Sequence, residues 1–141
     1  MYEKYTRQSL PSREYRELLG SAVCVFNSNN SFIIENILRL NDNQYSWTQL
    51  LDNNTGYLKR AIEDTITKIA GNSIAKLFED IIKRRNRIVH SFQITDSDGE
   101  QKMATRDKET GEQYVITQEY LLNFISDNER LSGMLYSLRG F

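Results

Sequence analysis

The sequence has very little cysteine, histidine or proline, with one residue of each among 141. A single cysteine, Cys24, excludes a disulfide within the chain. One cysteine with one histidine also argues against a zinc site built from a single chain. Cys24 lies close to Ala22, Val23 and Phe26, so we expect it to be a buried small residue. A lone thiol is typical of a reducing compartment, which predicts a cytoplasmic protein.

Long apolar runs and an excess of one charge are also missing. The longest apolar segments are far too short to span a bilayer, and the polar segment from Met1 to Leu10 does not resemble a signal peptide. The 18 basic and 19 acidic residues nearly balance, which excludes a general polyelectrolyte binder. Any contact with nucleic acid must therefore come from a local basic patch. The chain also lacks the glycine-rich phosphate-binding motifs, and nothing marks a nucleophilic serine.

Because helix breakers are scarce and apolar residues recur at helical spacing, the chain is expected to be mostly helical. Pro11 and Ser12 form a start signal for one long helix that ends near Leu40. Its apolar stripe keeps the same phase across a polar centre at residues 27–31; a pair of helices is the alternative. The following segment, 41–54, is expected to be a connection with a short helical turn at Ser46 to Leu51.

Three further helices are expected. The first runs from Thr55 to Ile69, with these residues facing inward: Leu58, Ile62, Ile66 and Ile69. The next runs from Ile74 to about His90 and is capped by Ser73. The last begins after the cap residue Thr117, carries Glu119 in its first turn, and buries a longer apolar set: Leu121, Phe124, Ile125, Leu131, Met134, Leu135 and Leu138.

Residues 93–116 differ in character from the helical segments. Asp98-Gly99 and Thr110-Gly111 are turn signals, and β-leaning residues flank them, which predicts a small exposed β-hairpin. The expected fold is all-α: an antiparallel four-helix bundle with this β insertion, forming one domain over residues 1–141.

The most informative segment is Lys83-Arg84-Arg85-Asn86-Arg87-Ile88-Val89-His90, which holds four cations, no acid and the only histidine. At 100° per residue, Arg85 points into the middle of the apolar stripe of its helix, where a charge is costly without a partner. Asn86, Arg87 and His90 share the neighbouring face. Cations beside one imidazole indicate a site that binds phosphate and moves a proton.

Simpler interpretations exist for several of these residues. A histidine at a helix end can serve as a C-cap, and Lys83 and Arg84 can form a solvated face. The acidic pairs Glu63-Asp64 and Glu79-Asp80 lie on polar helix faces, where we expect them to be solvated or paired with lysines. Only Arg85 conflicts with its surroundings, and such conflicts concentrate at functional sites.

The segment from Arg85 to His90 resembles the R-x4-6-H motif of the HEPN superfamily, with four residues between arginine and histidine and a polar Asn86 directly after the arginine. The resemblance implies a HEPN-like helical domain with a metal-independent endoribonuclease activity and no cofactor. Arg85, Asn86 and His90 would form the catalytic set, and Lys83, Arg84 and Arg87 would at most contact the RNA backbone. The β insertion is not a general feature of that family.

The resemblance also implies a cytoplasmic homodimer in which two motifs meet in one cleft, as in toxin–antitoxin and antiviral or abortive-infection effectors. RNA cleavage through the 2′-OH needs a base, an acid and charge stabilisation, and two chains together offer two histidines and two arginines. DNA lacks the 2′-OH and would be spared.

Two other hypotheses stay open. The chain could be a non-catalytic HEPN-like module that dimerises, or that binds a nucleotide, an antitoxin or a nucleotidyltransferase. Alternatively it could be a purely structural helical protein in which Arg85 pairs with an acid on the first or last helix.

Overall fold

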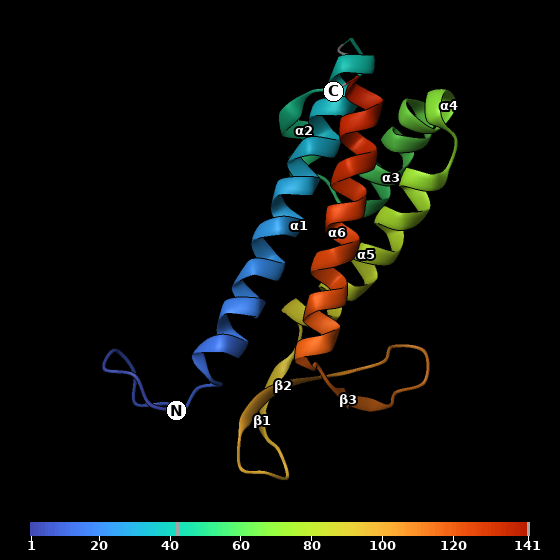
Figure 1. The fold of residues 1–141 in the computed structure, drawn as a ribbon. Helices are drawn as coiled ribbons and strands as arrows, with labels where there is room; N and C mark the ends of the chain where they lie inside the picture. The colour runs from blue at the N-terminus through green and yellow to red at the C-terminus, as the bar shows by residue number, and fades with distance from the viewer. Residues whose placement is uncertain (42, 141) are drawn as a thin grey trace.

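The computed structural model describes residues 1–41 and 43–140, and within these residues the chain forms six helices and three strands (Figure 1). The helices are α1 (Arg13–Leu40), α2 (Trp47–Asp52), α3 (Thr55–Asp64), α4 (Ile66–Ala70), α5 (Ser73–Val89) and α6 (Gln118–Arg139). The strands are β1 (Phe92–Thr95), β2 (Gln101–Arg106) and β3 (Gln113–Val115). The fold is thus mainly helical with a small antiparallel sheet, as the sequence predicts.

The three long helices lie together, with α1 and α6 parallel and α5 antiparallel to both (Figure 1). Contacts along the α1–α6 pair keep the same order in both helices: Asn29 bonds to Asn128, and Phe32 packs against Tyr136. The expected antiparallel arrangement therefore applies to α5 alone. The reason is that the segment expected to form the second bundle helix is divided into the short helices α3 and α4. These stay near the end of the molecule where α1 ends, so α5 alone runs back before α6 begins (Figure 1).

Helix α1 is continuous over 28 residues, which confirms the single long helix. Ser12 caps it by accepting a hydrogen bond from the backbone N–H of Tyr15. The polar centre causes no break, because Asn29 is buried and donates to the backbone oxygen of Asn128 at 2.8 Å and to its side-chain oxygen at 3.0 Å. The polar residues here join two helices instead of ending one.

The region between α1 and α5 is more broken than expected. A short helix, α2, occupies the predicted helical turn. The helix expected from Thr55 to Ile69 is two helices, because Thr65 leaves helical geometry at ψ −74° and its hydroxyl donates to the Ala61 carbonyl at 2.7 Å. This break leaves Ile69 64% exposed, so the prediction that it faces inward is wrong.

The boundaries of α5 and α6 are close to those expected. Ser73 is the first residue of α5, and Asn72 occupies the cap position without a side-chain hydrogen bond, so the predicted Ser73 cap is wrong. Thr117 does cap α6, by accepting from the backbone N–H of Tyr120 at 3.0 Å. The expected inward residues of α6 are all buried or half-buried.

One continuous apolar core fills the space between the helices. Each long helix contributes large side chains that are almost fully covered, among them Ile33, Ile37, Ile81, Phe124 and Leu131. Cys24 is not among them: it is exposed on α1, contrary to expectation. Side chains of residues adjacent in sequence point in different directions on a helix. The apolar residues next to Cys24 in the sequence therefore do not cover its side chain.

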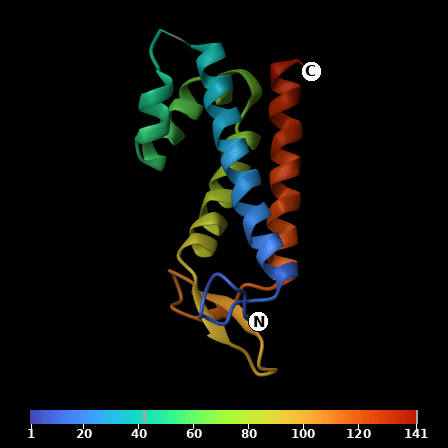
Figure 2. The same cartoon turned by 90° about the vertical axis from the view of Figure 1, so that its left-hand side faces the viewer.

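The insertion is a three-stranded antiparallel sheet in the order β1-β2-β3, not a simple hairpin. We call residues 92–116 the arm. Figure 2 shows it at the end of the molecule where α1 and α6 begin, beside the N-terminal segment. The buried Tyr15 hydroxyl anchors it, donating to the Ile116 carbonyl and accepting from the Met103 N–H at 3.1 Å. Within residues 1–41 and 43–140, none of the helices has the length and apolar character needed to cross a bilayer.

Candidate functional site

The basic segment occupies the last turns of α5, where the helix reaches the arm (Figure 1). His90 is the C-cap residue, and its backbone N–H bonds to the Asn86 carbonyl at 3.1 Å. Its imidazole is exposed and bonds to no other residue in the part of the chain that the structure describes. The cap position thus keeps the side chain free at the surface of the molecule.

Arg85 points from α5 toward α1, into the apolar stripe, as the helical geometry predicts. Its guanidinium carbon lies 4.6 Å from the centroid of the Phe26 ring, and Phe26 itself stacks on Phe78 at 6.1 Å. The side chain is half-buried, and burial lowers the pKa of Arg85. A cation over an aromatic face gains some energy but does not replace hydrogen bonds.

No carboxylate of residues 1–41 or 43–140 forms an ion pair with Arg85, and its buried Nε has no acceptor. The hypothesis of an internal acid on the first or last helix is therefore wrong for the described chain. A buried donor without an acceptor is costly. The Nε of Arg84 is also buried without an acceptor, but Arg84 has ion pairs, so Arg85 is the less satisfied of the two arginines.

Arg84, its neighbour, has the opposite environment. It lies on the α6 side of α5, bonded to Asp80 at 2.6 Å and to Asp127 at 2.7 Å, with its guanidinium over Phe124 at 5.7 Å. Only 20% of its side chain is exposed, so it does not belong to a solvated face. Two carboxylates already surround this charge, which leaves it little attraction for a phosphate.

A cavity of about 450 Å³ opens between the end of α5 and the arm. Four residues of the basic segment line it: Lys83, Arg84, Asn86 and Arg87. Its other walls come from the arm and from the first turn of α6: Asp107, Lys108, Glu109, Tyr114 and Tyr120. We call this space the arm cavity.

The arm cavity gathers some of the predicted site residues but not all. Asn86 and Arg87 lie in it together, as expected from their shared helix face. Arg85 and His90 are not among its lining residues, since Arg85 turns toward Phe26 and His90 stands at the helix end. Asn86 therefore links the motif to the cavity.

Two tyrosines of the arm cavity were missed by sequence reasoning. Tyr114 on β3 and Tyr120 on α6 place their ring centroids 6.2 Å apart with a 47° tilt. Burial, together with the neighbouring Tyr114 hydroxyl, raises the pKa of Tyr120, so the Tyr120 phenol is neutral at pH 7. Each tyrosine is unremarkable in its own segment, and only the folded arm brings the two rings to the basic helix end.

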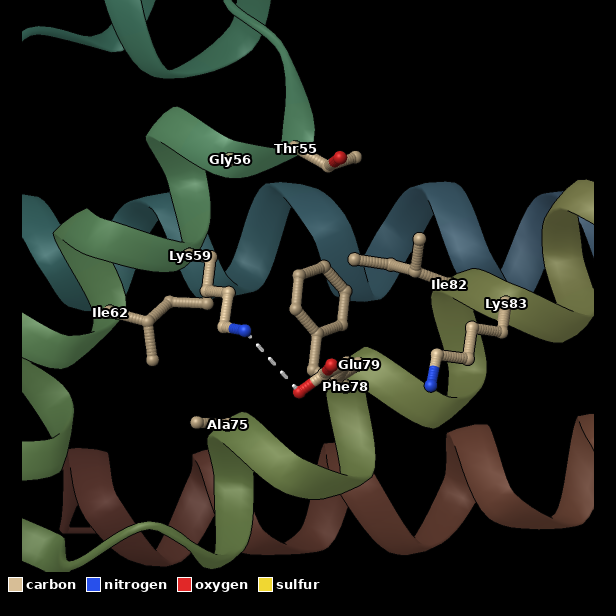
Figure 3. Close-up of a pocket in the computed structure, with 9 residues that line it drawn as sticks. All are labelled: Thr55, Gly56, Lys59, Ile62, Ala75, Phe78, Glu79, Ile82 and Lys83. Atoms are coloured by element: carbon tan, nitrogen blue, oxygen red, sulfur yellow. Dashed lines mark ion pairs between the residues drawn. The ribbon is translucent and has the colours of Figure 1, made fainter.

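A second cavity, of about 210 Å³, lies between α3 and α5 (Figure 3). Its walls are mostly apolar, with Phe78 at the centre, and Lys59 and Glu79 form an ion pair of 3.7 Å across it. Lys83 lines this cavity and the arm cavity alike. The apolar walls offer few groups for recognition of a polar ligand.

Among the described residues, no group of three or more His, Cys, Asp or Glu side chains is placed to hold a metal ion. Comparisons with protein-family models, with curated protein sequences and with solved structures found no match to this chain.

Proposed function

We propose that this protein is a HEPN-like, metal-independent endoribonuclease whose active site combines Arg85, Asn86 and His90 from two copies of the chain. The observation that carries the proposal is the Arg85 guanidinium, which lies half-buried on Phe26 without an ion pair or an acceptor for its Nε in the described chain. An unpaired cation in an apolar stripe lowers the stability of the fold. Residues that carry such a cost concentrate at functional sites.

The residues around Arg85 support this assignment. His90 is exposed and unengaged, and an imidazole can exchange a proton near neutral pH. Asn86 lies one turn before His90 and can orient a substrate oxygen through its amide. Together these groups supply a proton-transfer residue, an anion-binding residue and a polar support within two helical turns.

The chemistry favours a dimer. One chain offers a single imidazole, whereas attack by the 2′-OH and departure of the 5′-oxygen need both a base and an acid. Two chains meeting at the ends of α5 would provide two imidazoles and two guanidiniums around one phosphate. The expected products carry 2′,3′-cyclic phosphate and 5′-hydroxyl ends, and Lys83 and Arg87 would contact the RNA backbone.

We extend the proposal to the biological role that the motif implies. A small endoribonuclease of this kind would act in the cytoplasm as a toxin or antiviral effector, controlled by an antitoxin or a nucleotidyltransferase. We assign Arg84 to the structure of the helix end instead of to RNA, because Asp80 and Asp127 already bind it.

The test is cleavage of single-stranded RNA by the purified protein in the presence of EDTA. We expect cleavage by the wild type and a loss of about 100-fold or more for His90→Ala and for Arg85→Ala. Lys76→Ala is the matched control, since Lys76 is an exposed cation of α5 outside the motif. Intact RNA with the wild type, or equal cleavage by His90→Ala, would contradict the proposal.

One observation favours a second candidate, a non-catalytic HEPN-like module that dimerises and binds a nucleotide or a partner. The arm cavity collects Asn86 and Arg87 but excludes His90, as a binding site without proton transfer would. A stable dimer or nucleotide complex with no RNA cleavage would favour this candidate. Light scattering and the cleavage assay on the same preparation separate the two.

A further inference from the structure

We propose that the arm cavity is a subsite for one unstacked base of a single-stranded RNA, next to the phosphate that is cleaved. The inference rests on the proposed ribonuclease function and gives the arm a role in it. Asn86 supplies the connection, because it belongs to the motif and lines the cavity.

The aromatic pair is the feature best suited to a nucleobase. Tyr114 and Tyr120 both line the cavity, with rings 6.2 Å apart and tilted, so one ring supports the other without covering it completely. Bases of single-stranded RNA stack on such tyrosines, and stacking tolerates any base. The volume of about 450 Å³ can hold one base with its ribose.

The charges of the cavity are too balanced to hold RNA by themselves. Four cations line it, but Asp80 and Asp127 bind Arg84, and Asp107 and Glu109 add two carboxylates to the wall. Four carboxylates thus offset the four cations, and no net positive charge remains at the cavity. The recognition must therefore come mainly from the rings, with a shallow dependence on salt.

The wall that carries Tyr114 is held in place. Arg87 donates from Nη1 to the Arg106 carbonyl at 2.7 Å, and Arg106 in turn donates to the Gly111 carbonyl at 3.2 Å. Asp107 accepts from the backbone N–H groups of Glu109 and Thr110, which lowers the pKa of Asp107. The loop between β2 and β3 is thus formed before a ligand arrives, which reduces the entropy lost on binding.

The experiment measures binding of a short fluorescent single-stranded RNA by anisotropy, in a His90→Ala background that prevents cleavage. The RNA is compared with versions in which one nucleotide at a time lacks its base. We expect one position at which the missing base weakens binding about tenfold, and we expect Tyr114→Ala to weaken binding of the intact RNA by about the same factor. Removing that base and replacing Tyr114 in the same experiment should weaken binding no more than either change alone.

Two variants control for the fold. Tyr114→Phe keeps the ring and should bind within about twofold of the parent, because stacking does not need the hydroxyl. Tyr2→Ala removes an exposed tyrosine of the N-terminal segment and should change nothing. Circular dichroism checks that Tyr114→Ala retains its helices.

The outcomes separate the two proposals. The base subsite is wrong if Tyr114→Ala binds RNA as tightly as the parent does. It is also wrong if the loss of affinity is the same at every position where a base is removed, in the parent and in Tyr114→Ala alike. In either case the proposed ribonuclease activity can stand. If the missing base and Tyr114→Ala weaken binding without adding to each other, but the wild type leaves RNA intact, the ribonuclease proposal is wrong and the cavity is a binding site alone.

Discussion

The helical part of the molecule and the arm are stabilised in different ways. The helices share a core of large aliphatic and aromatic side chains, most of them less than 5% exposed. In the arm, the buried residues are few and small or located at its edge: Ala104, Thr105 and Ile116. Backbone pairing and polar contacts such as those of Tyr15 and Arg87 hold the strands.

This difference bears on the site, which lies where the two regions meet. The helical part contributes Arg85 and His90 on a helix fixed by packing, and the arm contributes Tyr114 on a wall fixed by hydrogen bonds. Under the proposed function, the chemistry would lie on the rigid region and the recognition of RNA on a region that tolerates change.

The largest expected effect comes from truncating apolar side chains in each region. Leu131 of α6 is fully buried, so Leu131→Ala should lower the free energy of unfolding by about 2–5 kcal/mol. Ile94 of β1 is half-buried, and Ile94→Ala should cost about 1 kcal/mol or less. Urea denaturation followed by circular dichroism measures both, and equal losses would contradict the division into a packed region and a polar one.

The anchor between the regions is the second test. Tyr15→Phe removes the hydroxyl that bonds to Met103 and Ile116, leaving buried backbone groups without partners at a cost of about 1–3 kcal/mol. We expect faster hydrogen exchange at the Met103 amide and in the arm, with α5 and α6 little changed. Tyr57→Phe is the matched control, because the Tyr57 hydroxyl bonds to no residue in the described chain. If α5 and α6 lost as much protection from hydrogen exchange as the arm, the arm would not open independently of the helices.

The smallest effect concerns the turn between β1 and β2. Hydrogen bonds with the Asp98 side chain, with Lys102 and with backbone N–H groups lower the pKa of Asp96 from 3.8 to about 2. Because the folded pKa is the lower one, these contacts are fully present above pH 3.8 and are lost as the pH falls toward 2. The amide chemical shifts of Gly99 and Glu100 should report this transition, and a midpoint near 3.8 would contradict it.

Much of the helical part could be predicted from the sequence, because the spacing of apolar residues predicts which face of each helix packs against the core. The long helix α1 and the position of Arg85 in the apolar stripe both follow from it. The break at Thr65 could not be found in this way, since a threonine hydroxyl bonds to its own helix only in some contexts.

The site was less predictable. The carboxylate of Asp127, which binds Arg84, is 43 positions away in the chain, and no local pattern connects the two. Tyr114 and Tyr120 likewise meet only through the path of the arm. Turn signals located both loops of the arm correctly, but they did not reveal a third strand or the cavity that it closes.

The exposed thiol of Cys24, the only one in the sequence, makes the native chain ready for site-directed spectroscopy. A nitroxide attached there would sit on α1, two positions before Phe26, whose ring the Arg85 guanidinium covers, and no cysteine would have to be removed. Double electron–electron resonance between the labels on two chains would measure the distance between their α1 helices in the proposed dimer.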